Sequence, residues 1–144
     1  MPQPLVLNEQ LGFNINRAAL LFRRELVRAF REYNISPEQW QVLASLWHKS
    51  PLNQKEIGQI TLQEPPTLSR MIDKMETNGW VLKTQDPLDK RSTLVELTEQ
   101  GRGLQKILPE KLLEHFKEFL KPFPQKKQET LRTLLLELRA ALDD

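Results

Sequence analysis

Hydrophobic residues recur every three to four positions along most of this chain, the spacing of one buried helix face. Six segments share this period and are predicted to be helices: residues 8–33, 37–48, 53–60, 65–77, 98–120 and 125–142. Proline lacks the backbone N–H that a helix interior needs, so Pro109 is expected to bend or restart the fifth helix. The pattern therefore predicts a mainly α-helical chain.

The stretch from residue 64 to 102 departs from this pattern and is the most informative. The apolar positions of its helix are Leu68, Met71, Ile72 and Met75. Asn78 and Gly79 follow as a helix stop, because both residue types tolerate a left-handed backbone. Residues 80–85 and 92–97 are rich in β-branched and aromatic side chains and are predicted strands. Residues 86–91 form a polar loop between them, so a small two- to three-stranded β-wing follows the helix.

Polar residues predict where two earlier helices begin. Ser36 with Gln39, and Asn53 with Glu56, each have the spacing of a capping box, in which side chains and backbone N–H groups bond reciprocally. The helix that starts after Asn53 and the one that starts at Pro65 then form a helix-turn-helix pair. Thr98 is a predicted N-cap for the helix after the wing. These elements together predict a winged helix-turn-helix, a layout that places a helix in the major groove of DNA.

The order and wording of these elements resemble the MarR family of bacterial transcription regulators. The loop DPLDKR matches the family's Asp-x-x-Asp-x-Arg wing pattern, and VELTEQG matches its x-x-LTxxG exit. PPTLSRMIDKMETNGWV is similar to the family's recognition helix, with Met75 where leucine is more common. The resemblance covers essentially the whole chain, and its motifs lie between Leu52 and Gly101. It implies a homodimeric, sequence-specific regulator that binds double-stranded DNA, and most often represses transcription.

The length suits a single MarR-type domain over residues 1–144. Its winged helix-turn-helix core is expected over about residues 36–98, and its dimerisation helices over about 5–33 and 99–144. The apolar faces of these terminal helices exceed what a small winged helix can cover. They either pack on one another within a monomer or interleave with a second copy, as the resemblance implies. A dimer would present two recognition helices to a pseudo-palindromic site.

The predicted recognition helix carries a polar face that suits DNA. Thr67, Arg70 and Lys74 recur at i, i+3 and i+7, opposite the apolar stripe, with Ser69 beside them and Pro66 at the helix start. Arginine bonds a guanine edge through two donors, and threonine contacts an edge or a thymine methyl. Lys74 is expected to contact a phosphate, which positions the protein without reading sequence. The alternative is a solvated helix face without a partner.

In the wing, Arg91 is the expected minor-groove contact and Lys90 the contact to the flanking DNA backbone. The resemblance implies that Asp89 holds Arg91 by a charge-assisted bond rather than repelling DNA. Asp86 is expected to organise the turn. The alternative for the Asp89–Arg91 pair is an ordinary surface salt bridge in a hairpin.

Net charge adds little to this interpretation. The formal charge of +2 and the pI near 9.0 are only mildly basic. Between Arg70 and Arg102 the acidic residues are as numerous as the basic ones. DNA binding must therefore depend on geometry, with the basic side chains facing the groove and the acidic ones turned away.

Composition also excludes several functions. The chain has no cysteine, so disulfides, zinc–thiolate sites and thiol redox sensing are excluded. No apolar run approaches the roughly 20 residues of a membrane span, and the N-terminus does not read as a signal peptide, so a cytoplasmic protein is expected. The two histidines, His48 and His115, are far apart, and no catalytic constellation is present. We therefore predict a protein that is not an enzyme and needs no metal or cofactor.

The resemblance further implies release from DNA by a small aromatic or anionic effector. Phe13, Arg17, Trp40 and Trp47 come from elements expected to line a crevice between the DNA-binding and dimerisation regions. The alternative is that the tryptophans are core residues and Arg17 lies on the surface. For the whole chain, the alternative function is a winged-helix protein-interaction module without sequence-specific DNA binding. Loss of the groove-facing bases would be its sign, and those bases are present.

Overall fold

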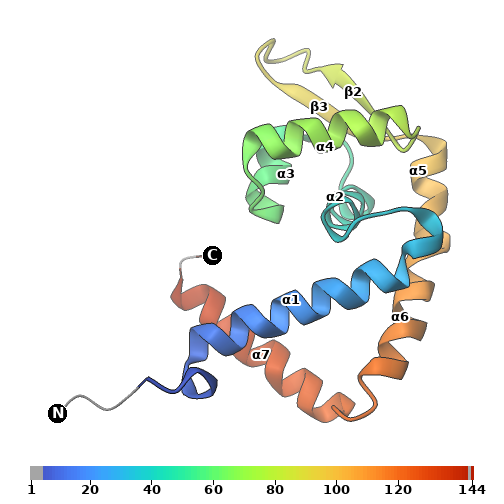
Figure 1. The fold of residues 1–144 in the computed structure, drawn as a ribbon. Coiled ribbons are helices and arrows are strands. Elements are labelled where there is room, and N and C mark those ends of the chain that lie inside the picture. The colour runs from blue at the N-terminus through green and yellow to red at the C-terminus, as the bar shows by residue number, and fades with distance from the viewer. Residues whose placement is uncertain (1–4, 143) are drawn as a thin grey trace. The chain divides into compact units, whose positions relative to one another are not determined.

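The computed structural model describes residues 5–142 and residue 144 of the chain (Figure 1). Its helices are α1 Leu11–Ala29, α2 Pro37–His48, α3 Gln54–Thr61, α4 Pro65–Thr77, α5 Glu99–Gly103, α6 Leu108–Phe119 and α7 Gln125–Ala141. Three short 3-10 turns accompany them: η1 Leu7–Glu9, η2 Arg31–Tyr33 and η3 Leu104–Lys106. The strands are β1 Leu52–Asn53, β2 Val81–Gln85 and β3 Thr93–Leu97, in the antiparallel order β1–β3–β2. The predicted mainly helical winged fold is confirmed.

The chain forms two compact units, Met1–Leu112 and Leu113–Asp144. The first contains α1 to α5, the sheet and the start of α6, and the second contains the rest of α6 and α7. The single-domain organisation expected from the sequence stays a prediction. Among the described residues, every helix is too short or too polar to cross a bilayer.

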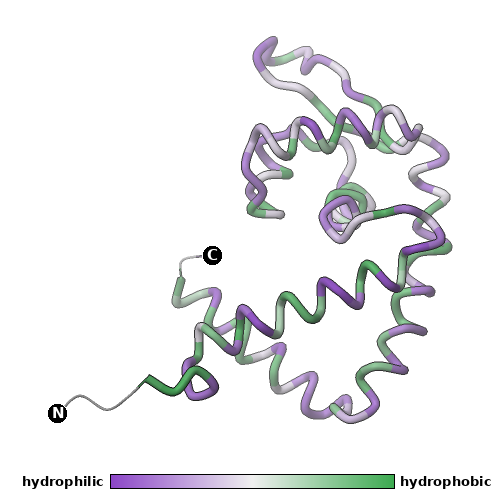
Figure 2. Tube along the Cα trace, viewed as in Figure 1, coloured by the Kyte–Doolittle hydropathy of each residue, from purple (hydrophilic) through white to green (hydrophobic). Residues whose placement is uncertain are grey.

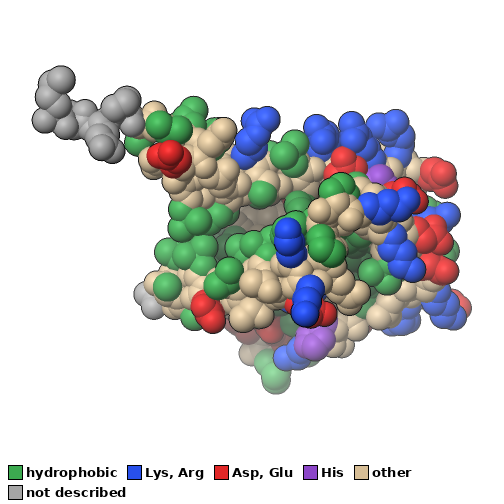
Figure 3. Space-filling model, turned by 90° about the horizontal axis from the view of Figure 1, so that it is seen from below, with side chains coloured by type: hydrophobic (Ala, Val, Ile, Leu, Met, Phe, Trp, Pro, Cys, Tyr) green, Lys and Arg blue, Asp and Glu red, His purple; other side chains and the backbone are tan. Residues whose placement is uncertain are grey.

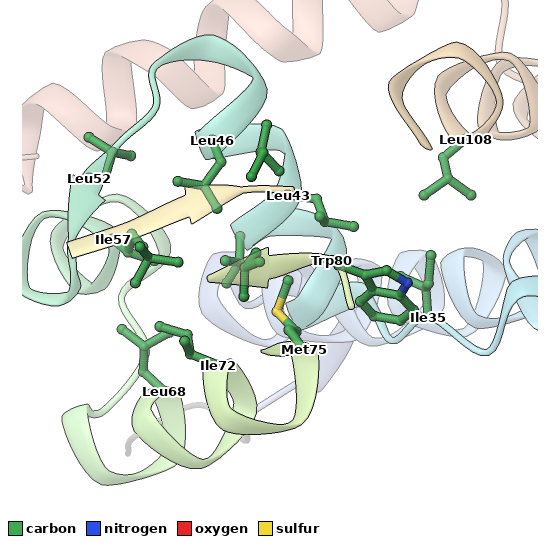
Figure 4. Close-up of a cluster of buried hydrophobic side chains, with 14 of the residues drawn as sticks. Ile35, Leu43, Leu46, Leu52, Ile57, Leu68, Ile72, Met75, Trp80 and Leu108 are labelled. Carbon is green, nitrogen blue, oxygen red and sulfur yellow. The ribbon is translucent and has the colours of Figure 1, made fainter. Parts of the chain in front are cut away.

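The core of the first unit joins side chains from every element of the winged helix (Figure 4). Leu43 of α2, Ile57 of α3, Ile72 of α4 and Val95 of β3 are completely buried. Burying a side chain of this size contributes about 1.5–3 kcal/mol, so contacts among distant segments hold α4 and the sheet together. Figure 4 shows Met75 and Ile72 of α4 in the same cluster as Leu46 and Leu52. The polar face of α4 is thereby left outward.

Both predicted capping boxes are present. The Ser36 hydroxyl accepts the Gln39 N–H at 3.1 Å, and the Gln39 side chain accepts the Ser36 N–H at 3.0 Å. The Asn53 side chain accepts the Glu56 N–H at 2.8 Å, and Glu56 accepts the Asn53 N–H at 3.2 Å. These bonds satisfy N–H groups that have no partner within the first turn, and they fix where α2 and α3 begin.

The predicted first helix is wrong at both ends. Gln10 has an extended backbone, so α1 begins at Leu11 and the residues before it form η1. After Ala29 the chain tightens into η2 and reverses at Asn34, whose φ of 55° is left-handed. Figure 2 shows both turns as mainly hydrophilic, but the helical spacing of apolar residues does not record the first, since Leu7 and Leu11 are four positions apart across it. The restart near Pro109 is confirmed, since η3 separates α5 from α6.

Candidate nucleic-acid interface

Helix α4 has the faces that the sequence predicted. Leu68, Ile72 and Met75 are at most 2% exposed and point into the core. Pro66, Thr67, Arg70 and Lys74 are exposed, and Ser69 is half-buried. Pro65 and Pro66 occupy the first two helical positions, where a missing N–H removes no intrahelical bond. All the residues of α4 that were predicted to contact DNA are therefore at least partly exposed to solvent.

The turn before α4 contains a left-handed residue and a hydrogen bond to α2. Leu62 ends α3 in a left-handed conformation, with a φ of 58°, which is uncommon for a leucine. The Gln63 side-chain amide then donates to the carbonyl oxygen of Glu38 in α2 at 3.4 Å. These features set the angle at which the chain leaves α3 and enters α4, and hence the direction of the exposed face.

The wing is a hairpin with a tightly bonded tip. Its strands pair from Val81 opposite Leu97 to Gln85 opposite Thr93. Beyond them, the Asp86 N–H donates to the Ser92 carbonyl at 3.0 Å, and the Ser92 N–H donates to the Asp89 carbonyl at 2.9 Å. These backbone bonds make the tip a defined loop.

The two aspartates of the wing both bond backbone N–H groups, as aspartate does in polar turns. Asp86 accepts the Leu88 N–H at 2.9 Å, which fits its expected role in organising the turn. Asp89 accepts the Arg91 N–H at 3.0 Å. The bond that the structure shows between Asp89 and Arg91 is donated by the Arg91 main chain, and the expected bond from the guanidinium stays a prediction. The Arg91 side chain is exposed.

In this region the acidic side chains are bonded within the protein, whereas the exposed basic side chains are not. On α4, Asp73 pairs with Lys83 of β2, and the Glu76 carboxylate accepts a backbone N–H of the same strand. The wing aspartates are used as described above. In α4 and the wing loop, all described, the exposed bases donate no side-chain bond; they are Arg70, Lys74, Lys90 and Arg91. Geometry thus provides the charge asymmetry that the composition lacks.

Thr98, Gly79 and Gly101 come together at the wing exit, a contact that the sequence did not predict. The Thr98 hydroxyl accepts the Gly101 N–H at 3.0 Å, which confirms the predicted N-cap, and donates to the Gly79 carbonyl at 2.6 Å. A Cβ on Gly101 would lie 2.1 Å from the carbonyl oxygen of Trp80. Gly79 itself has a φ of 82°. The LTxxG exit motif is therefore a close backbone crossing between the end of α4 and the start of α5.

The predicted effector residues fall into two groups. Trp40 lies between Phe30 and Trp47, with ring centroids 5.0 and 5.4 Å away. Both tryptophans are half-buried and pack against the core. The Trp47 indole N–H donates to the Gly101 carbonyl at 3.0 Å, so it links α2 to the wing exit. These contacts are sufficient to explain the tryptophans as core residues.

Phe13 and Arg17 lie on the N-terminal half of α1, where Phe13 is half-buried and Arg17 is exposed. Arg17 precedes Phe30 by about 20 Å along the helix, at about 1.5 Å per residue. Within one chain, α1 thus holds Phe13 and Arg17 well away from the tryptophans. A shared effector site stays a prediction.

Comparison with known proteins agrees with this geometry. The model of the MarR family matches residues 35–93. The chain is 32% identical over 127 residues to the uncharacterized HTH-type transcriptional regulator YwoH of Bacillus subtilis (strain 168), covering 88% of this chain and 92% of YwoH.

Two solved structures described as bound to DNA are also similar. One is reduced AbfR bound to DNA, with a TM-score of 0.80, 26% identity, and coverage of 95% of this chain and 92% of that one. The other is the transcriptional repressor CouR bound to a 23-mer duplex, with a TM-score of 0.86, 24% identity, and coverage of 95% and 99%. At that identity the likeness to CouR shows the fold alone.

Proposed function

The chain belongs to the MarR family, and from that premise we propose that it is a homodimer that binds a pseudo-palindromic operator in double-stranded DNA and regulates transcription. Its relatives are transcriptional regulators rather than enzymes, in agreement with the sequence prediction. One observation carries the proposal. The exposed bases of α4 and the wing are free of intramolecular partners, while neighbouring acids are bonded within the protein.

The proposed binding mode uses the helix and the wing differently. Helix α4 enters the major groove, where Thr67 and Arg70 face base edges and Lys74 contacts a phosphate. Arg91 reaches the adjacent minor groove, and Lys90 contacts the backbone beside it. The bonded loop at the tip supports this role, because a side chain on a fixed backbone loses less entropy on binding.

The exposed apolar surface supports a homodimer. On α1, large side chains remain exposed along the helix: Leu11, Leu20 and Leu21 are 68%, 60% and 40% exposed. The second unit exposes a further set: Leu113, Leu131, Leu134, Leu135 and Leu136. Figure 3 shows many hydrophobic side chains at the surface that it views. Soluble proteins rarely leave such surfaces uncovered, and a second copy with the same surface is the simplest cover.

We further propose that the dimer represses nearby genes in the cytoplasm by occluding a promoter, and that a small aromatic acid releases it. The half-buried rings of Trp40 and Trp47 support the aromatic part of this proposal, because aromatic rings favour offset and edge-to-face contacts and the exposed part of either ring can make one with a ligand. Titration of tryptophan fluorescence with a panel of aromatic acids tests it. A saturable change for one acid, with loss of DNA binding at the same concentration, is expected. A flat response across the panel would contradict the effector proposal.

The experiment that tests DNA recognition is selection of bound duplexes from a random pool at physiological salt. We expect a two-fold-symmetric consensus whose half-sites lie about 10 bp apart. Salt-sensitive binding without a consensus would leave only backbone affinity. No enrichment by a folded dimer would overturn the proposal in favour of a protein-interaction module.

A further inference from the structure

One lysine of the wing engages both acids on the recognition helix. The Lys83 ammonium of β2 bonds the Asp73 carboxylate of α4. The Lys83 backbone N–H donates to the Glu76 carboxylate, one turn further along α4, at 2.8 Å. A side-chain bond and a main-chain bond from the same residue thus fasten β2 to α4.

The strand pattern explains why Lys83 faces the helix. Side chains alternate along a strand, so Lys83 shares a face with Val81, which is completely buried, and not with the exposed Leu82. Strand β2 lies at the edge of the sheet, where outward N–H groups lack a strand partner. Glu76 supplies that partner. The direction of the Lys83 side chain therefore follows from the strand pairing, and not from the flexibility of a long surface side chain.

The charge of Asp73 makes this contact relevant to DNA. Asp73 lies three residues after Arg70 and directly before Lys74, on the helix that carries the candidate base contacts. Its side chain is 55% exposed, so without a partner its negative charge would act on the approaching phosphates. The bond to Asp73 raises the pKa of Lys83, so the lysine stays charged and the pair is neutral.

We propose that Lys83 is a positioning residue for DNA binding: it neutralises Asp73 and fixes the wing on α4, and it does not itself contact DNA. This inference rests on the proposed DNA binding. The opposite role for a lysine on a wing strand is a direct phosphate contact. In the structure, however, the ammonium is engaged by Asp73, and the Lys83 side chain is only 29% exposed.

A double-mutant cycle separates the two roles. Affinity for the selected operator duplex is measured by fluorescence anisotropy for the wild type, Lys83→Gln, Asp73→Asn and the double variant. We expect Lys83→Gln to weaken binding about 5- to 10-fold by exposing the Asp73 charge. Asp73→Asn should stay within about twofold of the wild type, and so should the double variant, because the charge that Lys83 offsets is then absent and the Lys83 N–H still fastens β2 to Glu76.

Salt dependence gives an independent measure. If Lys83 neutralised a phosphate, the log–log salt slope of the double variant would fall by about 0.9 relative to the wild type. We expect no such change. A double variant as weak as Lys83→Gln, or a slope reduced by one phosphate, would overturn the proposal. Equal affinity of Lys83→Gln and the wild type would also overturn it.

Two controls keep the test decisive. Lys83→Arg retains the charge and the reach to Asp73, and should bind within about twofold of the wild type. Thermal unfolding of each variant shows whether the fold is kept, and an affinity loss at an unchanged melting temperature is the expected result for Lys83→Gln. If the wild-type protein itself bound no duplex, the proposed function would fail before the cycle began, so the two failures are distinguishable.

Discussion

The winged-helix core and the C-terminal helix α7 use leucine-rich faces in opposite ways. In α4, the three core-facing side chains are at most 2% exposed. In α7, no residue is buried, and Leu131 and Leu134 are 41% and 55% exposed. The same helical period therefore occurs in a face that is buried within the chain and in a face that stays exposed. Periodicity identifies the apolar side of a helix, but not what covers it.

The largest effect should come from filling the backbone crossing in the winged region. Gly101→Ala places a Cβ 2.1 Å from the Trp80 carbonyl oxygen, so the backbone must move, and we expect a loss of roughly 2–3 kcal/mol in unfolding free energy. Gly103→Ala is the matched control on the same helix, because a Cβ there meets nothing within 4 Å. Chemical denaturation of both variants tests this. Similar stabilities for the two variants would contradict the proposed crossing.

Charging the α7 face should instead act on assembly. In the proposed dimer, Leu134→Glu would bury two unpaired carboxylates, and we expect the dimer dissociation constant to rise at least about 100-fold. The monomer should still fold, since Leu134 is outside the buried core. Sedimentation across a concentration series measures both properties. Leu88→Glu is the control, because Leu88 is 96% exposed at the wing tip and should leave assembly unchanged. A dimer unaffected by Leu134→Glu would remove α7 from the interface.

Removing the wing arginine should affect DNA binding and neither stability nor assembly. Arg91→Ala is expected to weaken operator binding about 10-fold or more, because its side chain is exposed and free to enter the minor groove. Lys126→Ala removes an equal charge on a different element, α7, and serves as the control. Anisotropy titrations and melting temperatures of both variants check this. Unchanged affinity for Arg91→Ala would exclude the wing from the mechanism.

The smallest effect is expected at the turn before the recognition helix. Leu62 is 80% exposed and has a left-handed backbone, which costs a leucine about 1 kcal/mol or more. Leu62→Asn should therefore raise the unfolding free energy by up to about 1 kcal/mol, because asparagine tolerates this conformation. Urea denaturation measures the change. A clear destabilisation would mean that the Leu62 side chain makes a needed contact despite its exposure.

Much of the winged region was predictable because its signals are local. The capping boxes at Ser36 and Asn53 depend on side chains reaching N–H groups three residues away, and both were predicted. The polar face of α4 follows from helical periodicity. The wing loop also bonds within itself, as the bond from the Arg91 N–H to Asp89 illustrates. Interactions between residues only two or three positions apart can be predicted from the local sequence.

The parts that were missed depend on contacts between distant segments. Spacing alone did not predict that Lys83 would bond Asp73 and Glu76, because a lysine on a strand faces either the helix or solvent, depending on the register of the sheet. The role of Gly101 against Trp80 likewise appears only when the end of α4 and the start of α5 cross. The pattern for α1 was extended too far for the same reason, since its ends are set by backbone turns.

The sequence by itself therefore determined the order of elements, the caps, the apolar faces and the candidate bases, through interactions within one or two turns. Only the tertiary structure decided which acids are neutralised, which bases stay free and which apolar faces remain uncovered. The physical reason is that charge pairing and burial depend on distances in space between residues far apart in the chain, and those distances exist only after the helices and the sheet have packed.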